Sequence, residues 1–177
     1  MPPSEVVAEL RALGAGKRAL LGALHMDDLS VDDLADIAWS GDPRHLVTVR
    51  LTLERARGGE VEYLCARAPS GAPVGKLCIE CGRFADAGYL SQFATHPRLQ
   101  GRGIGTFVMA GAEQRIRRRG RVRARISVEA ANPRAQALYE RLGFEVVGHG
   151  VERWDRDDAP TAQSADVVLL CKELEPS

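Results

Sequence analysis

The chain has 177 residues, of which 45% are hydrophobic and 27% charged, and its formal net charge is zero. This composition is typical of a globular protein, and the charge balance gives no indication of nucleic acid as a partner. No hydrophobic run approaches the roughly 20 residues that cross a bilayer, and no signal-peptide core is present. We therefore expect a cytoplasmic protein with no membrane partner and one domain over residues 1–177, with residues 1–17 as an N-terminal helical extension.

The first sixty residues show mainly helical patterns. The predicted elements are a helix at 4–13, a first strand at 20–24, a helix at 30–40 and a helix from 42 to 58. The glycine cluster at 14–18 lacks the leading glycine and the hydroxyl residue of a nucleotide-binding P-loop, so we interpret it as a turn.

A strand-rich stretch follows. The predicted strands are 61–67, 73–81 and 89–95, with turn residues at 68–71, and their order indicates an antiparallel meander. Cys78 and Cys81 form a C-x-x-C pattern within one of these strands. Residues three apart in a strand face opposite sides, so we expect packed thiols and no metal site.

The second half alternates helices and strands. A helix is predicted to run to about residue 119, followed by a strand at 121–129, a helix at 132–143 and strands at 144–148 and 166–174. The polar segment 153–164 is predicted to be a loop. Helices that follow strands in this way indicate a mixed α/β protein.

Between the strand at 89–95 and its helix lies a glycine-dense bend, Gln100-Gly101-Arg102-Gly103-Ile104-Gly105. Backbone N–H groups at the start of a helix are unpaired and lie at the positive end of its dipole, so the bend is a candidate anion site. A dinucleotide fingerprint needs G-x-G-x-x-G, but Thr106 occupies the third glycine position. No P-loop lysine follows the bend either.

Two motifs in order carry a resemblance to a known family. Gln100-x-x-Gly103-x-Gly105 is followed about thirty residues downstream by Asn132-Pro-Arg-Ala-Gln-Ala-Leu-Tyr139 and Leu-Gly-Phe. This pair resembles the GCN5-related N-acetyltransferase (GNAT) family. The resemblance implies an α/β three-layer fold, with a mostly antiparallel twisted sheet, splayed middle strands and helices on both faces. It also implies acetyl-CoA as co-substrate without a metal, an amine acceptor in a small molecule or a peptide, and homodimers.

The resemblance further implies the site residues. The cofactor-binding residues would be Phe93, Ala94, Thr95, Gln100, Gly101, Arg102, Gly103, Ile104, Gly105, Thr106 and Asn132. The glycines let the backbone approach the pyrophosphate closely, and an N–H group of the strand can polarise the thioester carbonyl. Tyr139 matches the tyrosine that protonates the leaving thiolate.

The general base is open. Some family members carry a glutamate twelve residues before the tyrosine, where this chain has Ser127. Glu129 lies two residues further on the same strand face and is our candidate catalytic base. Glu80, Gln92 or a water molecule are the alternatives.

Two other functions are considered. The departure at Ser127 suggests a catalytically inert CoA-binding regulatory module. The seven arginines between residues 115 and 125 suggest a nucleic-acid binder, but no aromatic residue is interleaved with them. We interpret the arginines as a solvated helix end, and we favour direct acetyl transfer to an amine.

Overall fold

The computed structural model describes residues 3–12, 16–154 and 163–175. Its elements, in chain order, are α1 (Pro3–Ala12), α2 (Lys17–Ala23), β1 (His25–Asp28), η1 (Val31–Asp33), η2 (Ala38–Ser40), α3 (Pro43–Arg57), β2 (Val61–Arg67), β3 (Pro73–Glu80), β4 (Ala87–Thr95), η3 (Pro97–Leu99), α4 (Ile104–Arg118), β5 (Arg123–Glu129), α5 (Pro133–Arg141), β6 (Glu145–Trp154) and β7 (Gln163–Glu173).

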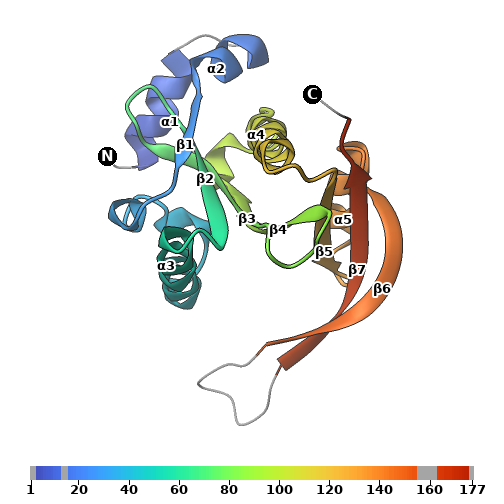
Figure 1. Ribbon diagram of the computed structural model, residues 1–177. Helices are drawn as coiled ribbons and strands as arrows, with labels where there is room; N and C mark the ends of the chain where they lie inside the picture. Colours follow the sequence, from blue (N-terminus) through green and yellow to red (C-terminus); the bar gives the residue numbers. More distant parts are fainter. Residues whose placement is uncertain (1–2, 13–15, 155–162, 176–177) are drawn as a thin grey trace.

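The strands form one mixed sheet in the order β1-β2-β3-β4-β5-β7-β6 (Figure 1). Neighbouring strands are antiparallel except β4 and β5, which are parallel. The β4–β5 ladder begins at Ala87↔Arg123 and ends at Leu90↔Ile126, although both strands continue beyond it. The predicted fold class is therefore confirmed, including the splayed middle strands.

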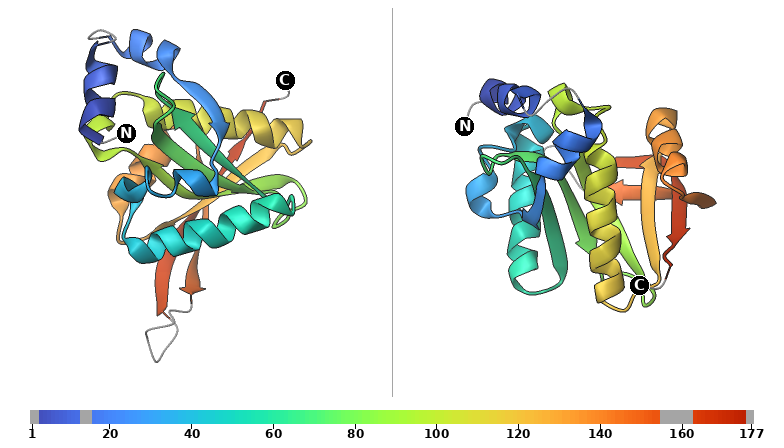
Figure 2. Two further views of the ribbon diagram at one scale, coloured as in Figure 1. Left: turned by 90° about the vertical axis from the view of Figure 1, so that its left-hand side faces the viewer. Right: turned by 90° about the horizontal axis from the view of Figure 1, so that it is seen from above.

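The sheet separates two hydrophobic clusters. On β2, Leu64 and Ala66 belong to the larger cluster with residues of α1, α2, α4 and α5. Tyr63 and Cys65 alternate with them and belong to a smaller cluster with α3. In Figure 2, seen from above, α3 and α4 lie on either side of the green strands. This is the predicted three-layer arrangement, and it follows from the period-2 alternation of strand side chains.

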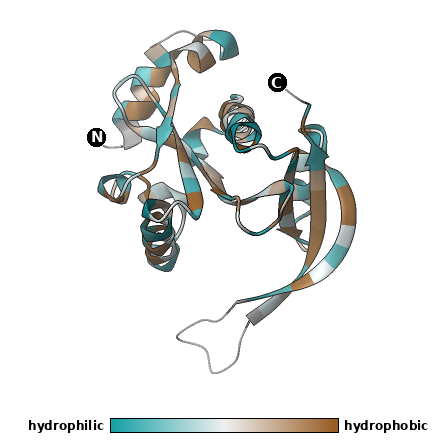
Figure 3. Ribbon diagram, viewed as in Figure 1, coloured by the Kyte–Doolittle hydropathy of each residue, from teal (hydrophilic) through white to brown (hydrophobic). Residues whose placement is uncertain are grey.

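The hydropathy pattern matches these positions. Figure 3 shows β7, which lies between β5 and β6, coloured hydrophobic over most of its length.

The two cysteines of the C-x-x-C pattern fall into different clusters, Cys78 beneath α3 and Cys81 in the larger core. Among the described side chains, no group of three His, Cys, Asp or Glu is arranged to hold a metal ion.

Two predictions near the N-terminus are wrong. The residues predicted as the first strand lie mainly in α2, where Leu20 is buried, and the first strand is β1. A short apolar run does not distinguish a strand from a buried helix. The predicted helix at 30–40 is broken into η1 and η2. Asp33 receives two hydrogen bonds from Arg67 of β2, at 2.7 and 2.9 Å, which fix the chain after its first turn.

The C-terminal strands are longer than predicted. β6 and β7 form a long hairpin that occupies both ends of the segment predicted as a loop (Figure 1). Residues 155–162 of that segment lie outside the described residues. β6 is the edge of the sheet, where exposed polar residues are tolerated, so its hydrophobic pattern is weak. No helix in the described ranges is long and apolar enough to cross a membrane.

The arginines of α4 and β5 are largely committed to ion pairs. Arg115 and Arg119 both bind Glu62 of β2. Arg123 lies between Asp86 and Glu173, at 2.5 Å from each. These ion pairs link α4 and β5 to neighbouring segments, so the role of these arginines is structural.

Candidate functional site

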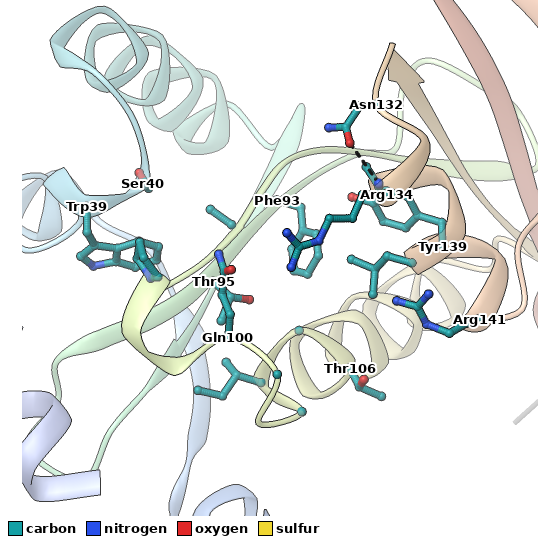
Figure 4. A pocket seen from close by; sticks show the side chains of 18 of the residues that line it. Trp39, Ser40, Phe93, Thr95, Gln100, Thr106, Asn132, Arg134, Tyr139 and Arg141 are labelled. Carbon is teal, nitrogen blue, oxygen red and sulfur yellow. Dashed lines mark hydrogen bonds between the residues drawn. The ribbon is translucent and has the colours of Figure 1, made fainter. Parts of the chain in front are cut away.

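A pocket of about 730 Å³ lies where β4 and β5 diverge (Figure 4). Its walls come from the end of β4, the glycine bend with the start of α4, α5, and Trp39 and Ser40 of η2. All the sequence-predicted cofactor residues except Arg102 line it, and so does Tyr139. The fold thus brings together two motifs that are about thirty residues apart in the chain.

The bend leaves the first turn of α4 without a side-chain cap. Its N-cap residue is Gly103, with a left-handed backbone (φ 89°), and Gly101 has φ 76°. Glycine adopts this conformation without steric cost. The first N–H groups of α4 therefore remain available at the pocket wall, which is the geometry of an anion site at a helix start.

Lys17 is a pocket residue that the sequence reasoning missed. It begins α2, and a Cβ built on Gly103 would overlap its Cε. Together with Arg134 and Arg141, it places three cations around the pocket, and the described lining contains no carboxylate. The pocket therefore favours an anionic ligand. In the sequence, Lys17 lies only within the glycine cluster at 14–18, and nothing in that cluster indicates a contact with Gly103, which is 86 residues further along the chain.

The wall from β4 contains a bulge. Cys78 pairs with Ser91 and Lys76 with Ala94, so Gln92 and Phe93 lie opposite the single residue Leu77. Gln92 has φ 52°, which is uncommon for a residue other than glycine. A bulge shifts the side chains that follow it to the other face of the strand. The Phe93 ring contacts the Tyr139 ring, with centroids 6.2 Å apart.

Tyr139 lies on α5 between Phe93 and Phe144, and only 7% of its surface is exposed. Burial raises the pKa of its phenol to about 12. The hydroxyl is therefore protonated at neutral pH, as a proton donor must be. Its position on an apolar helix face is compatible with both packing and donation.

Asn132 begins α5. Its side-chain oxygen accepts a hydrogen bond of 3.1 Å from the Ala135 N–H, as expected of an N-cap. Figure 4 draws this bond at the edge of the pocket. The cap uses the oxygen, so the amide NH₂ group is the part of Asn132 that remains for a ligand.

The candidate bases are in different environments. Glu80 pairs with Arg55, and the Gln92 side chain is bonded to Tyr63 and Thr52. Glu129 is exposed at the end of β5 and does not line the pocket. These contacts give Glu80 and Gln92 structural partners on the α3 side of the sheet.

Sequence reasoning missed a further carboxylate, Glu152 of β6. It accepts hydrogen bonds from Ser127 at 2.7 Å and from Tyr89 at 3.0 Å. Ser127 follows the last paired residue of the β4–β5 ladder, so the carboxylate lies near the point where the two strands separate and, like Glu129, outside the described lining of the pocket. The predicted strand ended before residue 152, and no pattern linked Glu152 to Ser127.

Comparisons with known proteins agree with this geometry. Residues 29–144 match the model of the acetyltransferase (GNAT) family. A comparison with curated protein sequences finds no match.

Solved structures share the fold at low identity. A chimera of the spermidine N-acetyltransferase SpeG from Vibrio cholerae and hSSAT has a TM-score of 0.67 at 16% identity, covering 85% of this chain and 95% of that one. The ribosomal-protein alanine N-acetyltransferase from Escherichia coli has a TM-score of 0.66 at 19% identity, covering 87% and 96%. The PaiA N-acetyltransferase from Thermoplasma acidophilum, in complex with coenzyme A, has 0.61 at 17% identity, covering 85% and 98%.

The family model spans well over half of the chain and includes the glycine bend, Asn132 and Tyr139. The solved structures extend the same fold over most of the remainder. The chain therefore belongs to the acetyltransferase (GNAT) family, and it is an acetyl-CoA-dependent N-acetyltransferase.

Proposed function

We propose that the protein transfers the acetyl group of acetyl-CoA to a primary amine of a small molecule or of a peptide or protein N-terminus. The observation that carries this proposal is the pocket between β4 and β5, which is lined by both the glycine bend and Tyr139. Two similar structures are named for spermidine and for a ribosomal-protein alanine, both of which present amines.

The cofactor would lie along the pocket. Backbone N–H groups of residues 101–106 would bind the pyrophosphate, with Gln100 and Arg102 adding side-chain contacts. Phe93, Ala94 and Thr95 would offer backbone groups to the pantetheine arm, and Asn132 would lie near the reacting end. The three cations of the pocket support this assignment, because acetyl-CoA is highly anionic.

The reaction requires two proton movements. A free alkylammonium has a pKa of about 10.4, so the acceptor must lose a proton before its nitrogen attacks the carbonyl carbon. The C–S bond then breaks, and the thiolate leaves with the bonding pair. We infer that the Tyr139 hydroxyl donates the proton that completes the CoA thiol.

We infer that a carboxylate on the Ser127 face accepts the acceptor's proton, directly or through water. Glu129 is one candidate, because it shares the strand face of Ser127. Glu152 is the other, and its fixed carboxylate supports it more strongly, since hydrogen bonds hold it at the separation of the strands. The reaction as proposed needs no metal ion.

Transfer is proposed to be direct, in a ternary complex. The described lining of the pocket contains no cysteine, and its tyrosine is kept protonated by burial. Trapping a covalent acetyl-enzyme during turnover would contradict this part of the proposal.

The proposal is tested by measuring thiol release from acetyl-CoA with polyamines, small primary amines and peptides with free N-termini. We expect at least one class to support turnover. If acetyl-CoA binds but no amine is acetylated, the alternative of an inert CoA-binding regulatory module is favoured instead.

A further inference from the structure

Lys76 of β3 is fully buried, and the reaction outlined above does not use it. Its ammonium group donates three hydrogen bonds, to the Tyr63 hydroxyl at 2.9 Å, to the Gln92 carbonyl at 3.0 Å and to His45 Nε2 at 3.0 Å. No carboxylate in the described ranges forms an ion pair with it. An ammonium has three donors, so these acceptors satisfy it completely without neutralising its charge. Such a buried, unneutralised charge is costly and calls for a physical role.

Two of the acceptors of Lys76, the Tyr63 hydroxyl and the Gln92 carbonyl, belong to residues of one hydrogen-bond chain. Tyr63 donates onward to Gln92 Oε1 at 3.1 Å, and Gln92 Nε2 donates to Thr52 Oγ1 at 2.9 Å. Gln92 is therefore held at both its side chain and its carbonyl. This residue has the left-handed backbone of the β4 bulge, so the network holds the bulge in place.

The Gln92 carbonyl shares its peptide group with the Phe93 N–H. In a planar trans peptide the two bonds point in opposite directions, so this N–H points away from Lys76. β5 no longer pairs with β4 at this level, and Phe93 lines the pocket. A cation bound to the carbonyl draws electron density from the amide and makes the N–H a stronger donor, because linked hydrogen bonds polarise one another.

We propose that Lys76 is a positioning residue for acetyl transfer: its ammonium polarises the Gln92–Phe93 peptide, and so strengthens the Phe93 N–H that binds the thioester carbonyl oxygen. This inference rests on the proposed function, in which that oxygen meets a backbone N–H of β4. The positive charge acts through one peptide unit and never touches the substrate.

Burial lowers the pKa of Lys76 to about 8. The other titratable groups around it are His45 on α3, Tyr63 and Cys65 on β2, and Cys78 on β3. Burial lowers the pKa of His45 and raises those of Tyr63 and both thiols, to about 12 for Cys65 and about 11 for Cys78. Between pH 7 and 9.5, Lys76 is therefore the member of this cluster that changes charge.

The test is the infrared carbonyl band of bound acetyl-CoA that carries ¹³C in the thioester carbonyl, measured without an acceptor. Polarisation of this carbonyl lowers its stretching frequency. We expect a lowered band at pH 7 that moves back towards its position in free acetyl-CoA as the pH rises to 9.5. This measurement on the unaltered protein needs no variant. A band with the same position at both pH values would overturn the proposal.

Two variants distinguish polarisation of the Gln92–Phe93 peptide from a purely structural role of Lys76 in holding the β4 bulge. Lys76→Met should remove the low-frequency band at pH 7 and lower kcat about tenfold, less than the factor of about 10²–10³ for losing such a donor altogether. Tyr63→Phe is the matched control, because it removes one acceptor of Lys76 but leaves its bond to the Gln92 carbonyl. It should keep both the low-frequency band and its pH dependence.

A Lys76→Met protein with the unaltered band would overturn the inference, whatever its kcat. Failure of the proposed function has a different signature, in which the unaltered protein binds acetyl-CoA but acetylates no amine.

Discussion

Ser127 of β5 donates a hydrogen bond of 2.7 Å to Glu152 of β6, two strands away in the sheet. The same carboxylate oxygen accepts from Tyr89 and lies 3.8 Å from the Arg83 guanidinium. The guanidinium itself lies over the Tyr89 ring, 3.9 Å from its centroid. A carboxylate from the edge hairpin is thus fixed beside Ser127, the position at which some family members carry a glutamate.

If this carboxylate accepts the acceptor's proton, Glu152→Gln should lower kcat/KM by about 10² or more, the usual contribution of general base catalysis. Acetyl-CoA affinity should stay unchanged. Glu129→Gln is the matched variant and should have a much smaller effect. A larger loss of kcat/KM in Glu129→Gln than in Glu152→Gln would assign the base to Glu129.

Tyr139→Phe should lower kcat by about 10² while acetyl-CoA affinity changes little, because only the donated proton is removed. Burial raises the pKa of Tyr139 to about 12, so its ionisation should not reduce kcat anywhere below about pH 11. Steady-state kinetics and a separate binding titration measure the two effects. Equal kcat for the two proteins would remove Tyr139 from the mechanism.

Gly103→Leu should abolish acetyl-CoA binding, because its side chain would enter the space shared by the bend and Lys17. Gly120→Leu is the matched control. Gly120 has φ 70°, follows the other end of α4 and has open space around its Cβ position. Both variants carry the cost of a left-handed non-glycine residue, about 1–2 kcal/mol. Thermal unfolding should therefore report similar losses, and only Gly103→Leu should lose the cofactor in a titration.

Lys76 predicts a dependence of stability on pH. Its pKa is about 8 in the folded protein, compared with about 10.4 in an unfolded chain. Between these values the unfolded chain binds more protons, so the contribution of Lys76 to the free energy of unfolding rises with pH. Below pH 8 Lys76 is protonated in both the folded and the unfolded chain, and the cost of burying its charge lowers the free energy of unfolding in full.

The measurement is denaturant unfolding of the unaltered protein and of Lys76→Met at pH 7.5 and 10. The stability of the unaltered protein relative to the variant should increase by about 2–3 kcal/mol between the two pH values. Buried thiols and phenols titrate in both proteins and cancel in this difference. A relative stability that is constant or falls with pH would contradict a depressed pKa for Lys76.

Much of the cofactor side of the site was predictable because it depends on local backbone geometry. Glycine spacing, an N-cap at Asn132 and a helical stripe that includes Tyr139 are short-range patterns, and the fold lines one pocket with them. The sheet and its layers followed from strand alternation in the same way.

The rest of the site depends on contacts between distant segments. No motif marks Lys17, Glu152 or Lys76. Lys17 contacts Gly103, Glu152 binds Ser127 and Lys76 binds His45, and in each pair the residues are 25 or more positions apart. Tyr63 and Gln92, the other partners of Lys76, are closer in the chain but lie on neighbouring strands. The broken helix at 30–40 has the same origin, since Arg67 of β2 holds Asp33 of η1. Single-sequence patterns record local preference and do not record such tertiary partners.

The left-handed backbone of Gln92 raises the question of why this position is not a glycine. A glycine there would relax the backbone at φ 52° and remove the strain. It would also remove the amide that Tyr63 and Thr52 hold, and the bulge would gain freedom to drift. The side-chain bonds of glutamine hold the strained backbone in place, so the strand is fixed directly before the residues that line the pocket.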